Sequence, residues 1–222
     1  MIPLRSTERV YSTAKVTVAL IVINVLVFLY EAALPSYAMT QFVEQWGMVP
    51  DRLRLASLFT SMFLHGSWTH ILGNMLFLWV FGRNVEDLLG GGRFFIFYIV
   101  CGLAAAMTQI VTNLYSPVPT IGASGAIAGV MGAYLIKFPR ARIVTLIPIF
   151  FFFTTAEIPA ALVLLFWFGM QFLSGLGSLT ETDYSGGGIA FFAHIGGFVA
   201  GMLLVRLFPE RRRWRTWNYW DQ

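Results

Sequence analysis

The sequence predicts an all-α membrane protein folded as a bundle of six transmembrane helices. Apolar residues make up 57% of the 222 positions and charged residues only 12%, whereas soluble domains carry about 25% charged residues. Several apolar runs approach the roughly 17 to 25 residues that a helix needs to cross a bilayer. Basic residues flank these runs unevenly, which is typical of membrane topology. We therefore expect the whole chain to form one membrane domain over residues 1–222.

Six apolar runs are the expected spans. The second and fourth are short or interrupted by Gly and Asn, which favours a position partly below the outer surface, in water-lined surroundings. A further apolar segment, Ile143–Phe153, is too short for a span and contains Pro148, so we expect an interfacial or re-entrant segment there. The expected spans are residues 16–34, 70–85, 94–115, 123–138, 159–176 and 189–208, followed by a basic cytoplasmic tail at 209–222.

The distribution of basic residues predicts the orientation. With the N-terminus inside, 13 of the 15 Lys and Arg residues lie in inner segments, and only Arg52 and Arg54 lie outside. Both termini are then cytoplasmic, and the short chain favours a prokaryotic plasma membrane. A cleaved signal peptide over Met1–Ala38 is the alternative interpretation, but the apolar core there exceeds the 7 to 15 residues usual for a signal.

Three outer loops follow from this topology, at residues 35–68, 116–120 and 178–188. Glycines 186–188 make the last of these a candidate mobile flap. The net charge of +4 does not indicate nucleic-acid binding, because the basic residues flank apolar runs instead of forming a surface stripe. Cys101 is the only cysteine and lies in an apolar run, so we expect a packing residue.

Polar side chains occur at three places inside the expected spans, each near the outer end of its helix. His70 and Asn74 are four residues apart and therefore share one helical face. Ser124 opens the fourth span between Gly122 and Gly125, and His194 lies in the sixth. Singly, each is most simply a packing or interhelical hydrogen-bonding residue. Together, at one depth, they suggest a catalytic site.

The three groups supply what acyl transfer requires. Ser124 would be the nucleophile and His194 the general base, with no carboxylate near enough to complete a triad. Asn74, His70 and the backbone N–H of Ser124 would stabilise the oxyanion. Small residues repeat every four positions beside Ser124 and beside His194, through Gly197 and Gly201, so the fourth and sixth helices can approach closely.

Other functional classes fit less well. A zinc site would have to use His65 and His70, but a spacing of five does not place two ligands on one helix face, so we expect no metal and no cofactor. A transporter is disfavoured because the spans show no internal repeat.

These motifs, in this order on alternating spans, resemble the rhomboid family of intramembrane serine proteases. The resemblance covers roughly residues 58–204 and includes a further motif, Gly82, Glu86 and Gly90 at spacings of four. It implies a six-helix rhomboid fold, a Ser124–His194 dyad, and an oxyanion site with His70, Asn74 and Gly122. The implied partners are single-span transmembrane protein substrates and the lipid bilayer, with no nucleic acid.

Two positions depart from the family pattern. Many members carry a Trp-Arg pair in the first outer loop where this chain has Ala56-Ser57, so that loop must be anchored differently. Some members stack a Tyr on the catalytic His from the position of Ala128. Non-enzymatic relatives usually lack the Ser or the His, whereas this chain has both.

Overall fold

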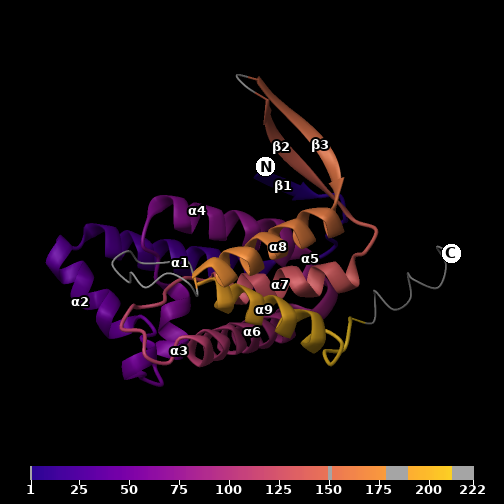
Figure 1. The fold of residues 1–222 in the computed structure, drawn as a ribbon. Helices are drawn as coiled ribbons and strands as arrows, with labels where there is room; N and C mark the ends of the chain where they lie inside the picture. The colour runs from indigo at the N-terminus through magenta and orange to yellow at the C-terminus, as the bar shows by residue number, and fades with distance from the viewer. Residues whose placement is uncertain (1, 150–151, 179–189, 212–222) are drawn as a thin grey trace.

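The computed structural model describes residues 2–149, 152–178 and 190–211 and is mostly helical (Figure 1). Helical structure occurs in all six ranges that the sequence predicts as spans. The main helices are α1 (Lys15–Ala33), α4 (Trp68–Phe77), α5 (Arg83–Leu89), α6 (Gly91–Thr112), α7 (Ser124–Lys137), α8 (Ala160–Ser178) and α9 (Phe191–Leu204). They run alongside one another around a shared apolar core.

Helix length separates two groups. Among the described residues, α1, α6 and α8 are long and apolar enough to cross a membrane, whereas α7 and α9 are apolar but have only 14 residues each. The second expected span is one helical run in which a π-helical turn, η3 (Leu78–Gly82), joins α4 to α5. Large apolar side chains remain exposed along α1 and α8, as expected for surfaces that face lipid.

A three-stranded antiparallel sheet corrects the expectation of an all-α fold. The segment predicted as interfacial or re-entrant forms a hairpin of β2 (Arg142–Ile149) and β3 (Phe152–Pro159), and β1 (Ile2–Ser6) pairs with β2. The fold is therefore not all-α. Val, Ile, Thr and Phe dominate this segment, and such β-branched and aromatic residues favour strands.

The first outer loop, expected at residues 35–68, is also largely structured. It contains α2 (Ser36–Trp46), α3 (Ser57–Thr60) and two short 3₁₀ turns, Pro50–Arg52 and Ser61–Phe63. The Thr60 hydroxyl donates to the Trp46 carbonyl at 2.6 Å, which ties the second half of the loop to α2. Most of the predicted flap, residues 179–188, and the end of the tail, 212–222, lie outside the described residues.

Glu86 joins α5 to the start of α1. Its buried carboxylate accepts hydrogen bonds from the backbone N–H of Val16 at 2.9 Å and from both the N–H and the hydroxyl of Thr17 at 2.7 Å. A carboxylate at a helix N-terminus satisfies unpaired N–H groups and complements the helix dipole. Gly82 lies beside Thr17 and leaves room for this approach, and Gly90 ends α5 with a φ of 83°.

Glycines set the separation of α7 and α9. A Cβ on Gly201 would overlap the carbonyl oxygen of Gly129, and a Cβ on Gly197 would overlap that of Gly125. The backbones of the two helices are therefore in direct contact, which only glycine permits at these positions. This contact fixes the relative position of the first turn of α7 and the first turn of α9.

We predict that Gly201→Ala destabilises the protein by about 1–3 kcal/mol, because the added methyl group must push α7 and α9 apart. Thermal unfolding in detergent measures the effect. Gly169→Ala on α8 is the matched control, since nothing lies within 4 Å of its Cβ position, and this variant should be as stable as the wild type or slightly more so. Equal stability of the two variants would contradict the packing argument.

Glu86→Gln should cost about 1.5–3 kcal/mol, the usual contribution of hydrogen bonds to a charged group. The amide retains one acceptor oxygen but turns an N–H toward the donors of α1. Glu157→Gln provides the control, because the ion pair of Glu157 with Arg142 is half-exposed at 3.8 Å and such pairs contribute about 0–1 kcal/mol. Unfolding by SDS titration measures the loss of stability in each variant. The loss should be clearly larger for Glu86→Gln than for Glu157→Gln.

Candidate active site

Ser124 occupies the first position of α7, directly after a constrained turn. Gly122 has a φ of 124°, a conformation that side chains disfavour, and its N–H donates to the Ser61 carbonyl at 2.8 Å. A Cβ on Gly122 would lie 2.8 Å from two ring atoms of His70. Glycine is therefore required at this position both by the backbone conformation and by the space that the His70 ring takes.

His194 lies on the facing turn of α9. Its Nε2 is 2.7 Å from the hydroxyl oxygen of Ser124, and its side chain is largely buried. The Gln109 side chain on α6 accepts from the backbone N–H of Ala193 at 3.2 Å and so satisfies one of the unpaired N–H groups at the start of α9. Neighbouring helices thus fix the turn that carries His194.

Gln171 and Trp167 on α8 complete the surroundings of His194, and neither was predicted from the sequence. The Gln171 Oε1 lies 2.7 Å from His194 Nδ1, and the Trp167 ring packs on the imidazole with centroids 5.6 Å apart. The two residues are four positions apart and share one helix face. The signal was present in the sequence, since Gln171 is the only amide side chain in α8.

The contact with Gln171 determines which nitrogen of His194 carries the proton. A carbonyl oxygen only accepts hydrogen bonds, so Nδ1 must donate to Gln171. The Nε2 of the neutral ring then has a free lone pair and accepts the hydroxyl proton of Ser124. This is the tautomer that a general base needs. Trp167 and Gln171 together support the ring where Ala128 offers nothing to stack on.

His70 and Asn74 lie beside Gly122. The Asn74 amide nitrogen donates to His65 Nε2 at 2.9 Å, and the other His65 nitrogen, Nδ1, lies 3.3 Å from the Phe63 carbonyl. Burial lowers the pKa of His65 to about 4, so the ring is neutral at physiological pH and both contacts form. The buried Glu31 carboxylate of α1 accepts from the His65 backbone N–H at 3.0 Å.

This network also explains how the first loop is held without a Trp-Arg pair. Glu31 fixes the backbone at His65, and His65 fixes the Asn74 amide, so the loop and α4 are joined to the C-terminal end of α1. Ser57, at one of the two departing positions, is buried and donates to the Arg54 carbonyl at 2.7 Å. The loop is therefore anchored by one local hydrogen bond and by hydrogen bonds to α1 and α4.

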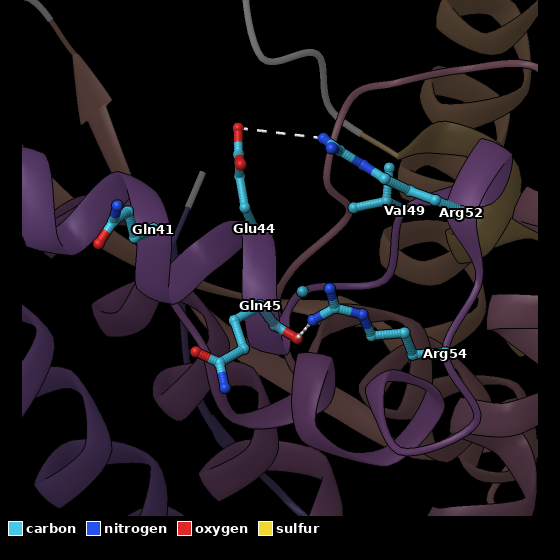
Figure 2. A pocket seen from close by; sticks show the side chains of 7 residues that line it. Gln41, Glu44, Gln45, Val49, Arg52 and Arg54 are labelled. Atoms are coloured by element: carbon cyan, nitrogen blue, oxygen red, sulfur yellow. Dashed lines mark hydrogen bonds and ion pairs between the residues drawn. The ribbon is translucent and has the colours of Figure 1, made fainter.

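Two pockets lie near these elements. A small one reaches Ser124 and is lined by Ser61, Met62, Gly122, Gly125 and Ala193, among others. The other lies between α2 and the following loop, where Glu44 faces Arg52 and the Arg54 guanidinium donates to the Gln45 carbonyl (Figure 2). Its lining contains no nucleophile, so of these two pockets the one at Ser124 is the candidate for chemistry. Within the described residues, no group of three His, Cys, Asp or Glu side chains is placed to hold a metal ion.

The remaining motif residues make packing contacts between helices. Gly197 and Gly201 form the α7–α9 contact, and Gly82, Glu86 and Gly90 lie near the start of α1. The structure therefore brings Ser124, His194, Gly122, His70 and Asn74 into one neighbourhood and leaves the other five as structural residues.

Comparisons with known proteins agree with this arrangement. The family model described as a rhomboid domain matches residues 52–211. The rhomboid protease GluP of Bacillus subtilis is 41% identical over 78 residues, which cover 35% of this chain and 15% of that protein. Rhomboid protein 1 of Saccharomyces cerevisiae mitochondria is 35% identical over 91 residues, covering 39% and 26%.

A longer match comes from a plant. RHOMBOID-like protein 1 of Arabidopsis thaliana is 29% identical over 171 residues, which cover 77% of this chain and 39% of that protein. The chain thus spans less than half the length of these relatives. Because the family model covers well over half of the chain, and the described helices are apolar enough for a membrane, this integral membrane protein belongs to the rhomboid family.

Proposed function

We propose that the protein is an intramembrane serine endopeptidase that cleaves membrane-anchored proteins within or next to their transmembrane segment. The observation that carries this proposal is the 2.7 Å contact between the Ser124 hydroxyl and His194 Nε2. The 2.7 Å contact of Nδ1 with Gln171 supports it, because it sets the tautomer required of a base. The match to the rhomboid protease GluP and to the rhomboid family model supports the same reaction class.

The reaction would follow the usual course of acyl transfer. Ser124 Oγ attacks the scissile carbonyl while His194 Nε2 takes its proton, and the imidazolium then gives that proton to the leaving amine. Water then attacks the carbonyl of the acyl-enzyme while His194 Nε2 takes a proton from the water. The imidazolium returns that proton to Ser124 Oγ as the acyl group leaves. Throughout, the carbonyl dipole of Gln171 holds the Nδ1 proton. A neutral amide stabilises the imidazolium less than a carboxylate would.

The oxyanion would be stabilised at the start of α7. The first turn of a helix leaves backbone N–H groups without intrahelical partners, and Ser124 is the first residue of that turn. The second N–H of the Asn74 amide, and the His70 ring that lies against Gly122, would add side-chain donors.

The length of α7 supports a site below the membrane surface. Its 14 residues span about 21 Å, whereas the hydrocarbon core is about 30 Å thick. Lys137, at the opposite end of α7, pairs with Glu210 at 2.8 Å and marks the inner boundary. Ser124 would then lie roughly 10 Å below the outer surface, as hydrolysis of a peptide bond inside the membrane requires.

The proposed topology has six spans with both termini on the inner side. Residues near the two ends of the chain do meet, since the Tyr11 N–H donates to Asp87 at 2.9 Å and Arg211 lies 3.8 Å from the same carboxylate. The proposed substrates are single-span membrane proteins that reach Ser124 from the bilayer. Relatives include mitochondrial and plant proteins, so the comparisons do not favour a prokaryotic plasma membrane.

Ser124→Ala and His194→Ala should each lower kcat/KM for a single-span substrate in proteoliposomes by at least about 10⁴-fold, because either change removes the nucleophile–base pair. Unfolding temperatures should stay near that of the wild type, which shows that the loss is chemical. Substantial cleavage by either purified variant would refute the dyad. Labelling of the wild type, but not of Ser124→Ala, by a fluorophosphonate would identify the nucleophile directly.

Gln171→Leu should reduce kcat about 10- to 100-fold with little change in KM, because the His194 ring loses the acceptor that fixes its tautomer. Gln171→Glu retains an acceptor oxygen at the same distance and should keep most of the activity. Initial rates over a range of substrate concentrations separate kcat from KM. If the Leu and Glu variants lose activity equally, Gln171 acts only through packing and the assigned tautomer is wrong.

A further inference from the structure

The sheet is divided into two chemically different halves. Arg142 and Glu157 bound a stretch of the hairpin, residues 143–156, that contains no charged residue. We call the part nearest the helices the basal half (Arg142–Thr145 and Ala156–Pro159). The part around the hairpin turn is the distal half (Leu146–Ile149 and Phe152–Thr155), and Ile2 of β1 pairs with Leu146 there.

The basal half is fixed to the helices. Ile143 and Thr145 are buried, β1 packs against η3, and the Ser6 hydroxyl is 2.5 Å from the Tyr134 hydroxyl of α7. The sheet is therefore a rigid extension of the bundle, and its direction is set by the helices. Figure 1 shows it standing out sideways from the helices instead of continuing along their length.

The distal half exposes large apolar side chains. Phe152 is 79% exposed and Phe153 is 71% exposed, and Ile2 on the neighbouring part of the sheet is 46% exposed. Two adjacent phenylalanines in water would lose the free energy that burial of apolar surface provides. Something apolar must therefore cover this end of the sheet.

Basic residues around the basal half indicate that lipid covers the distal half. Arg5, Arg140 and Arg142 are exposed around the basal half, and Lys15 lies at the adjacent start of α1. Guanidinium groups beside an apolar insertion are the arrangement found where protein meets anionic lipid headgroups. Since the helices cross the bilayer and the sheet leaves them sideways near the N-terminal end of α1, the distal half meets lipid and not bulk water.

We propose that the distal half of the sheet inserts into the membrane leaflet nearer the N-terminus, with Phe152 and Phe153 among the acyl chains and the basal arginines at the headgroups. The hairpin is then a lateral anchor. Because β3 ends at Pro159 and α8 begins at Ala160, the anchor also restrains the inner end of the helix that carries Gln171. The insertion itself does not depend on the chemistry of Ser124.

Fluorescence quenching in lipid nanodiscs tests this proposal. The full chain carries an environment-sensitive fluorophore on Phe153→Cys, with Glu157→Cys in the basal half as the matched control, and the buried Cys101 stays unlabelled. The discs hold one protein each and contain phosphatidylcholine and phosphatidylglycerol. Both faces of a disc are open to water. Iodide therefore quenches a label that is exposed to water on either face, and lipids with nitroxide on the acyl chain quench a label that lies among the acyl chains.

The label at position 153 should be quenched several-fold more by the nitroxide lipids than by iodide, and the label at 157 should show the reverse. Unchanged melting temperatures confirm that both labelled proteins are folded. Iodide quenching at 153 would overturn the proposal. Disulfide formation between position-153 cysteines in liposomes that hold several copies, combined with iodide quenching in single-copy discs, would instead assign the surface to a second copy of the chain.

Discussion

The backbone contact between α7 and α9 is the constraint on which the rest of the structure depends. In a bilayer the lipid tails are as apolar as the side chains, so close van der Waals packing must replace the hydrophobic effect as the force between helices. Gly125 and Gly129 meet Gly197 and Gly201 without intervening side chains. This places two short helices at the smallest possible separation, and it allows the first turns of both helices to share a hydrogen bond.

Polar groups at the two ends of α1 show how the remaining helices are held around that pair. At one end Glu86 accepts three hydrogen bonds from Val16 and Thr17, and at the other Glu31 accepts from His65, which in turn binds Asn74. Buried carboxylates are costly in lipid unless every lone pair has a donor. Glu86 has three donors, of which two are backbone N–H groups and one is the Thr17 hydroxyl, and Glu31 has the backbone N–H of His65.

The sequence predicted the helical ranges and the grouping of Ser124 with His194, because both rest on strong local signals: long apolar runs, and rare polar residues at bilayer depth. It did not predict the role of Gln171, since an isolated amide in a span has no partner that can be identified before the helices are packed. The sheet was missed for another reason. Pro148 and a short apolar run fit a re-entrant segment as well as a strand, and pairing with β1 from the distant N-terminus is a long-range event that no local pattern reveals.

The π-helical turn between α4 and α5 has a consequence for helical phase. In an uninterrupted α-helix, Asn74 and Glu86 would point about 120° apart, because each residue turns the helix by about 100°. One inserted residue, which is what a π turn accommodates, reduces this angle to about 20°. Both polar side chains then point to the same side of the helix, where Glu86 binds the start of α1 and Asn74 binds His65, whose backbone N–H binds Glu31 near the other end of α1. The turn at Leu78–Gly82 thus acts as a phase correction, and shortening it by one residue would rotate one of the two attachments away from α1.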